Sequence, residues 1–210
     1  MPRHATSHSF LPRLAASALV AAAAGVAGTA LGAPNSCSPL AAALAGKSRL
    51  AASATQSTST AALAGLPLRI EFADGSTERP AFVETAPGVV EARARGCVLR
   101  VRIQNSVSTN FELEVDSRAD AVRAVILGGR PNAIAFDAGS SELCGETPGS
   151  SLGAPAAMRT GNGRFEMLEP VRIGSASAAG DLFATLLVDF TAPIGPGGRA
   201  SWTIDTDEIR

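Results

Sequence analysis

The chain has 210 residues, a formal net charge of −1 and 46% hydrophobic residues. Proteins that bind nucleic acids usually carry a clustered basic face, and this charge balance gives no sign of one, so we expect no nucleic-acid partner. The only histidines, His4 and His8, stand near the start, and tyrosine is absent. Since histidine is the commonest general base and metal ligand, the rest of the chain excludes the usual triads and histidine metal sites.

Residues 1–32 have the pattern of a secretory signal peptide. Arg3 and Arg13 supply positive charge, residues 14–31 are apolar and rich in alanine, and Ala30–Gly32 offers a small-x-small cleavage site. An uncleaved membrane anchor is the alternative, but the apolar run contains few large side chains for a spanning helix. We therefore expect a protein exported to the periplasm or the extracellular space, with no membrane span after signal cleavage.

Residues 33–65 are dominated by Ala, Ser and Thr and contain no acidic or aromatic residue. Residues 39–54 could form a weak helix, but they lack a large apolar face with which to pack. The composition predicts a solvated linker between the signal peptide and the folded domain.

From Leu66 onward, apolar and charged residues alternate in short runs separated by Gly and Pro turns. Alternation with a period of two is typical of half-buried strands. We therefore predict an all-β domain over residues 66–210, an antiparallel β-sandwich of about nine short strands, with a barrel as the alternative. The expected strands cover 68–72, 90–94, 99–103, 111–115, 121–127, 132–137, 164–173, 182–190 and 200–205.

Three cysteines, Cys37, Cys97 and Cys144, follow the proposed cleavage site. In an oxidising compartment two of them should pair, and three different bridges are open. We favour a disulfide between Cys97 and Cys144, because both lie in the predicted domain. Cys37 would then remain a free thiol.

Four arginines mark the polar faces of two consecutive expected strands. If these strands form a hairpin, the arginines make a basic stripe that could contact an anionic polysaccharide or a lipid headgroup. The alternative is a solvated face that nearby carboxylates neutralise across the strands. The arginines are Arg93, Arg95, Arg100 and Arg102, and the carboxylates are Glu91, Glu112 and Glu114.

Three carboxylates, Asp205, Asp207 and Glu208, follow the last expected strand. Residues two apart share a face of a strand, and clustered carboxylate oxygens suit Ca²⁺. The pattern gives the hypothesis of a calcium site, to which one of Asp137, Asp181 and Asp189 could add a ligand. The alternative is an ordinary solvated tail. We expect no other cofactor.

The second half of the chain also resembles a loose class of exported bacterial β-sandwich surface proteins. Its pieces here are Ile134–Asp137, Asp181–Phe183, the turn Gly195–Gly198 and Ile204–Asp207. Proteins similar to it include PEP-CTERM-like and aggregation-factor-core-like proteins, although no Pro-Glu-Pro sorting tail follows Arg210. The resemblance implies a β-sandwich without catalytic activity.

These patterns predict an exported, non-enzymatic protein that acts in binding, in adhesion or as a surface or envelope component, with an extracellular or envelope ligand. Two alternatives remain open. One is a carboxylate-dependent envelope hydrolase, which needs no histidine. The other is a periplasmic inhibitor or accessory subunit that uses its edge strands as the contact.

Overall fold

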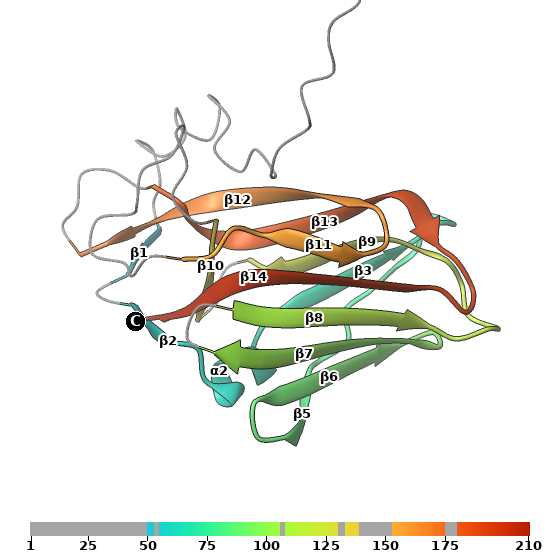
Figure 1. Ribbon diagram of the computed structural model, residues 1–210, viewed down its shortest axis with the longest axis horizontal. Coiled ribbons are helices and arrows are strands. Elements are labelled where there is room, and N and C mark those ends of the chain that lie inside the picture. The colour runs from blue at the N-terminus through green and yellow to red at the C-terminus, as the bar shows by residue number, and fades with distance from the viewer. Residues whose placement is uncertain (1–49, 53–54, 106–107, 130–132, 139–152, 175–179) are drawn as a thin grey trace, which may run out of the picture. The chain divides into compact units, whose positions relative to one another are not determined.

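The structure is a computed structural model that describes residues 50–52, 55–105, 108–129, 133–138, 153–174 and 180–210 (Figure 1). The predicted signal peptide lies outside these residues, as do Cys37 and Cys144. The described part is nearly all antiparallel β-sheet, which confirms the predicted all-β fold. No helix within it has the length and apolar character needed to cross a membrane.

Fourteen strands and one short helix are described. In chain order they are β1 (Leu50–Ala52), β2 (Thr55–Ser57), α2 (Thr60–Ala64), β3 (Leu68–Phe72), β4 (Thr77–Glu78), β5 (Val83–Ala86), β6 (Val89–Ala94), β7 (Cys97–Asn105), β8 (Ser108–Val115), β9 (Val122–Gly128), β10 (Ile134–Asp137), β11 (Ala157–Thr160), β12 (Gly163–Ile173), β13 (Leu182–Ile194) and β14 (Arg199–Ile209).

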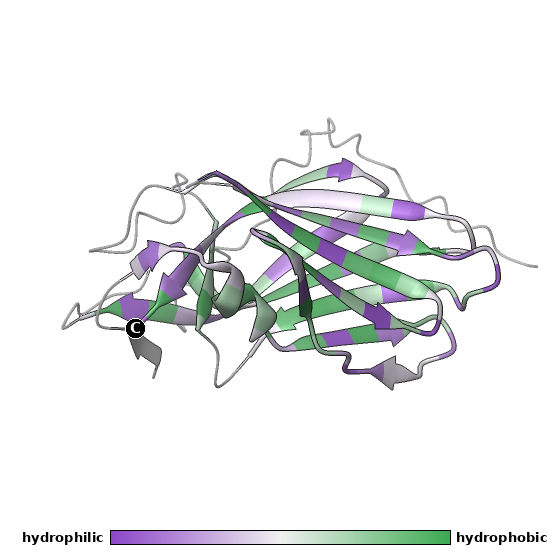
Figure 2. Cartoon of the chain, turned by 90° about the horizontal axis from the view of Figure 1, so that it is seen from below, coloured by the Kyte–Doolittle hydropathy of each residue, from purple (hydrophilic) through white to green (hydrophobic). Residues whose placement is uncertain are grey.

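All nine strands expected from the sequence are present, and five more are added to them. The additional strands are β1, β2, β4, β5 and β11, and each has two to four residues. Segments this short cannot display an alternating pattern, so periodicity does not reveal them. Alternation of hydrophilic and hydrophobic residues is visible along the longer strands (Figure 2).

The strands form two layers of a sandwich. One layer has the order β4-β3-β9-β13-β12, and β1 adds to β12 as a parallel strand. The other has the order β5-β6-β7-β8-β14-β11. The inner faces of both layers contribute to one hydrophobic core, as expected for an aligned sandwich.

Strand β14 connects the two layers. Its first half, Arg199–Ile204, pairs with β8, and its second half pairs with β10 and β2. Strand β10 also pairs with β13, so the hydrogen-bonded ladder passes from one layer to the other through these strands. One end of the sandwich is therefore closed by backbone pairing.

Trp202 of β14 occupies the centre of the core. Its side chain is fully buried, and its ring stacks on Phe111 of β8 with 5.5 Å between the ring centroids. Phe190 of β13 approaches the same indole edge-on at 6.4 Å. Three aromatic rings thus join the two layers.

The folded part of the chain begins before Leu66. Residues predicted as a linker form β2, which pairs with the end of β14, and helix α2. The Ser59 hydroxyl caps this helix by accepting a hydrogen bond from the Ala62 N–H at 3.1 Å. Leu63 buries its side chain completely in the core. Strand pairing with β14, a capped helix and one buried leucine therefore attach this segment to the sandwich.

Candidate functional site

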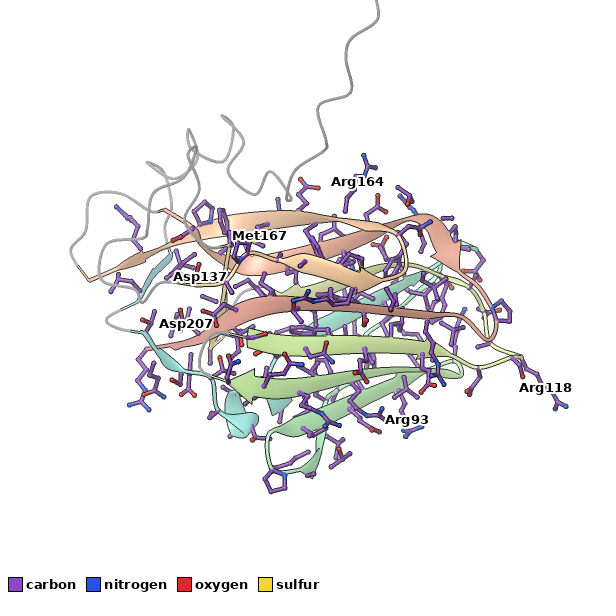
Figure 3. The ribbon with its side chains drawn as sticks, in the orientation of Figure 1. Arg93, Arg118, Asp137, Arg164, Met167 and Asp207 are labelled. Carbon is purple, nitrogen blue, oxygen red and sulfur yellow. The ribbon has the colours of Figure 1, made fainter. Side chains whose placement is uncertain are left out.

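Buried aspartates gather where β10 meets the second half of β14. Asp137 lies directly opposite Asp205, and the next position of this face brings Asp207 opposite Ala135. All three carboxylates are at most 3% exposed, and Asp137 and Asp207 lie at the same end of the sheet in Figure 3. Asp181 is also fully buried, and its backbone carbonyl accepts from the Ala138 N–H at 2.9 Å.

These aspartates are not a solvated tail, so that alternative is wrong. Strand β14 continues to Ile209, and its neighbours β10 and β2 enclose it on both edges. Asp137, Asp181, Asp205 and Asp207 each take part in at least one hydrogen bond or electrostatic interaction. Such partners offset the cost of burying a carboxylate.

The third member of the predicted calcium set, Glu208, lies on the other face of β14. Its Oε2 accepts a hydrogen bond from the Ser59 hydroxyl at 2.7 Å. This bond is the main cause of a lowered pKa for the Glu208 carboxyl. The side chain is therefore separated from Asp205 and Asp207, because neighbouring residues of a strand point to opposite faces.

The remaining candidate ligands divide in the same way. Asp137 does join Asp205, whereas Asp189 lies on the outer face of β13, where Arg164 approaches its carboxylate at 3.5 Å. Within the described residues, no three Asp, Glu, Cys or His side chains are grouped so that they could share a metal ion. Asp137, Asp205 and Asp207 are the carboxylates on one face that a cation would have to use.

The predicted β6–β7 hairpin exists, but its arginines do not form a basic stripe. Glu91 binds both Arg93, at 2.9 Å, and Arg100, at 2.7 Å. The hydrogen bond from Arg100 is the main reason that the pKa of Glu91 is lowered. Arg95 turns away from this face and binds Glu78 instead. Of the four arginines, Arg102 alone has no ion pair with a described residue. The alternative of neutralisation by nearby carboxylates therefore holds for Arg93 and Arg100.

The outer face of β6, β7, β8, β14 and β11 carries these pairs in regular rows. We call it the ion-paired face. One row of cross-strand neighbours begins at Ser201 and the next begins at Arg199. The rows read Ser201–Glu112–Arg100–Glu91 and Arg199–Glu114–Val98–Arg93. Opposite charges thus stand next to each other across the strands, which stabilises such pairs.

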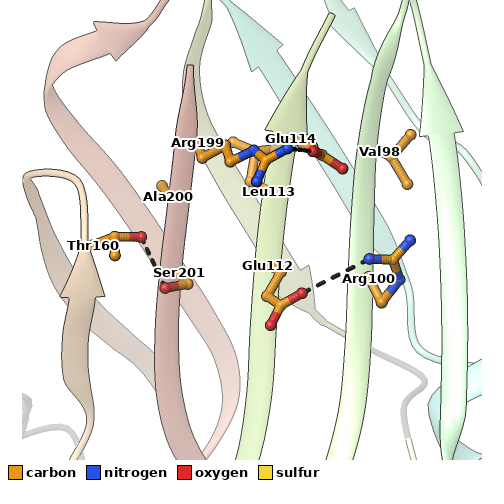
Figure 4. Close-up of a pocket in the computed structure, with 9 residues that line it drawn as sticks. All are labelled: Val98, Arg100, Glu112, Leu113, Glu114, Thr160, Arg199, Ala200 and Ser201. Carbon is orange, nitrogen blue, oxygen red and sulfur yellow. Dashed lines mark hydrogen bonds and ion pairs between the residues drawn. The ribbon is translucent and has the colours of Figure 1, made fainter. Parts of the chain in front are cut away.

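A shallow hollow of about 240 Å³ opens on the ion-paired face, between β7, β8, β14 and β11 (Figure 4). Two ion pairs line it: Arg100 lies 3.8 Å from Glu112, and Arg199 contacts Glu114. The Thr160 and Ser201 hydroxyls share a hydrogen bond of 2.8 Å beside them. Two positive and two negative side chains give this hollow no net charge.

No disulfide is seen at Cys97, the first cysteine of the predicted pair. It is a free cysteine in the structure, and its side chain is only 1% exposed. The residue begins β7, and it faces the core in register with Ala94 and Val115. Burial raises the pKa of the thiol to about 11, so it stays protonated at neutral pH. Its predicted partner, Cys144, lies outside the described residues.

Sequence reasoning missed the surface role of the short strand β11. Its Thr160 completes the hollow by reaching Ser201, yet four residues in a Gly- and Pro-rich stretch give no strand signal. Sequence reasoning did find every charged residue of the hollow except Arg199, which follows a glycine turn and resembles a loop residue.

No protein-family model, curated protein or solved structure matches this chain. The resemblance to PEP-CTERM-like surface proteins therefore stays a prediction.

Proposed function

We propose that this protein is an exported, non-enzymatic β-sandwich that acts by binding, as an adhesive or structural component of the cell envelope or surface. The ion-paired face is its contact surface. The observation that carries the proposal is the ordered set of opposite charges around the hollow, at Arg100, Glu112, Glu114 and Arg199. Side chains that hold one another in place lose little freedom when a ligand arrives, which favours binding.

The chemistry of this face indicates the kind of ligand. The charges that line its hollow balance, so a strongly anionic or cationic ligand gains no net attraction there. Guanidinium, carboxylate and hydroxyl groups nevertheless offer many donors and acceptors. These groups suit a neutral, polar and hydrogen-bonding ligand, such as an uncharged glycan or a polar protein surface.

The position of the buried aspartates supports binding over hydrolysis. A glycosidase needs two carboxylates that flank a bond of the substrate. Asp137 and Asp205 are directly opposite each other in register, and both are buried. The carboxylates that solvent reaches on the ion-paired face, Glu112 and Glu114, are already engaged with arginines.

The edge strand β5 favours the second candidate, an inhibitor or accessory subunit. It lies at the end of its layer, and all four of its residues are exposed, with Val83 at 63%. An extended segment of another protein could add to such an edge through backbone hydrogen bonds. Pro80 and Pro87 flank it, however, and prolines commonly protect edges from pairing.

A quantitative pull-down tests the proposed contact surface. The protein is immobilised and exposed to envelope fractions and to neutral polysaccharides, and Thr160→Lys places an unbalanced charge in the hollow. Retention should fall about tenfold, which corresponds to about 1.4 kcal/mol. The matched control is Ser117→Lys, at an exposed position in the turn after β8. Equal retention by both variants would exclude the ion-paired face as the contact surface.

A further inference from the structure

The outer face of the other layer, formed by β3, β9, β13 and β12, has an apolar centre. Ile126 of β9 is in register with Leu187 of β13, and both are half-buried. Together with Leu168, which is 41% exposed, they line a second hollow of about 240 Å³. Charged residues surround these three. An apolar centre with a polar rim is the usual plan of a protein–protein contact surface. We call it the β9–β13 face.

On the two flanking strands, β3 and β12, the charges of this face stand in opposite order, and the central strands add Arg123 and Asp189 beside the apolar residues. Cross-strand register aligns them in two rows, which read Arg69–Ile126–Leu187–Glu166 and Glu71–Ala124–Asp189–Arg164. On β3, therefore, a positive charge in the first row is followed by a negative one in the second. On β12 the order is negative, then positive. Arg164 projects from β12 in Figure 3.

We propose that the β9–β13 face binds a second copy of this chain about a two-fold axis that runs parallel to the strands, between β9 and β13. This rotation lays β3 of each copy over β12 of the other and keeps the rows in step. Arg69 then meets the partner's Glu166, and Glu71 meets the partner's Arg164. Ile126 packs on the partner's Leu187. The surface is self-complementary, as an isologous contact requires.

The apolar residues select this axis over the other one that would pair the charges. A two-fold axis across the strands, between the two rows, would set Arg69 over the partner's Glu71. It would also press Leu187 onto the partner's Asp189. The axis parallel to the strands sets Asp189 over the partner's smaller Ala124 instead and packs Ile126 on the partner's Leu187. It is therefore preferred, because burying a carboxylate against a large apolar side chain is costly.

The charges on β3 also favour a second copy over an unrelated partner whose surface carries charges of a single sign. Arg69 and Glu71 lie 3.3 Å apart on β3, so a uniformly charged surface would attract one of them and repel the other. The matching partner must present the same alternation in the reverse order. The β12 flank of another copy presents it at the same spacing.

Charge reversal tests the proposal in the full chain, with sedimentation equilibrium as the readout. Arg69→Glu should weaken the dimer about tenfold or more, because the new carboxylate faces the partner's Glu166. Glu166→Arg should weaken it similarly. The double variant Arg69→Glu/Glu166→Arg should restore it. If the axis ran across the strands, the double variant would not regain the dimer, because Arg69 and Glu166 would not meet.

The control is Arg118→Glu, an exposed residue at a distant turn, which should leave the dimer unchanged. Circular dichroism melts check that every variant is folded, and Glu71→Arg/Arg164→Glu repeats the rescue at the second row. A wild-type chain that stays monomeric up to about 1 mM would overturn the proposal. So would a dimer that ignores the single reversals or is not rescued by either double variant. The outcome is independent of the proposed function, because the ion-paired face is on the opposite layer.

Discussion

Arg95 donates a hydrogen bond from Nε to Oε1 of Glu78 at 2.9 Å, and this contact joins the two layers of the sandwich at one end. The same guanidinium lies 3.5 Å from Asp74 and 3.4 Å from Asp120, and its carbon stands 4.9 Å above the centre of the Phe72 ring. These contacts raise the pKa of Arg95, mainly through Glu78. One side chain of the β6–β7 turn thus bridges several elements of the other layer.

The backbone at Arg95 is strained, and this gives the first prediction. Its φ is +43° and that of Gly96 is +76°, the conformation of a two-residue hairpin turn that favours Asn-Gly. Arg95→Ala removes the contacts and keeps the strain, whereas Arg95→Asn removes the contacts and relieves the strain. We expect the melting temperature to fall in both variants, and further in the alanine variant. Arg118→Ala is the control. Equal melting temperatures for the two Arg95 variants would show that the turn is not strained.

The pKa of Glu91 gives a prediction about acid stability. Because the folded state lowers this pKa from 4.5, the carboxylate contributes stability above that pH and loses it as the pH falls through the folded value. Urea titrations across this range should show a smaller loss on acidification in Glu91→Gln. Some loss will remain, since the pKa values of Asp74 and Glu208 are also lowered. Glu84→Gln, on the exposed edge, should behave as the wild type, and an unchanged slope in Glu91→Gln would contradict the assignment.

Trp202 provides a test of core packing. Its indole Nε1 is buried and has no hydrogen-bond acceptor among the described residues. Trp202→Ala should cost about 3–5 kcal/mol in the free energy of unfolding, from lost burial and a cavity. Trp202→Phe should cost less, because it keeps a ring against Phe111 and removes a donor whose burial costs about 1–3 kcal/mol. Urea denaturation followed by circular dichroism measures both, and a cost for Trp202→Phe equal to that for Trp202→Ala would contradict this account of the packing.

The Cys97 thiol should resist alkylation in the folded protein. Its pKa of about 11 leaves little thiolate at pH 8, and its burial blocks the reagent. Iodoacetamide labelling followed by peptide mass spectrometry should find Cys97 unmodified in the native state and modified after unfolding. Rapid labelling of the native protein would show that β7 opens at its first residue.

The calcium hypothesis makes a prediction in which the two faces of β14 differ. If a cation binds at Asp205 and Asp207, millimolar calcium raises the melting temperature by stabilising the folded state, and Asp205→Asn/Asp207→Asn abolishes the rise. Glu208→Gln should leave the rise intact, because that side chain lies on the opposite face beside Ser59. Magnesium should have less effect. If calcium leaves the melting temperature unchanged, these aspartates have a purely structural role.

The sequence predicted the long strands because each carries its own alternation. The run from Leu68 to Phe72 shows three buried and two outward residues in strict order, as in the structure. It could not predict the burial of Asp205 and Asp207, because that depends on β10, which lies about seventy residues earlier in the chain and has only four residues. Local patterns place a charged residue on an outward face, but only the pairing of distant strands decides whether solvent reaches that face.

The same contrast between neighbouring and distant strands explains what could be predicted of the two outer faces. Glu91 and Glu112 were expected to neutralise Arg100, since the three residues stand on neighbouring strands of a simple meander. The β9–β13 face could not be foreseen, because its rows join strands that are far apart in the sequence, from Arg69 to Leu187.

Because β14 belongs to both layers of the sandwich, it also affects how the protein folds. This strand follows all the other described strands in chain order, yet β2, β8, β10 and β11 each pair with it. A chain that emerges from a ribosome or a narrow pore with its N-terminus first therefore leaves four open edges until β14 arrives. Long-range pairing of this kind makes folding slow. The sandwich is therefore completed late and cooperatively. A chain delivered through a pore would stay unfolded enough to pass through it until β14 has emerged.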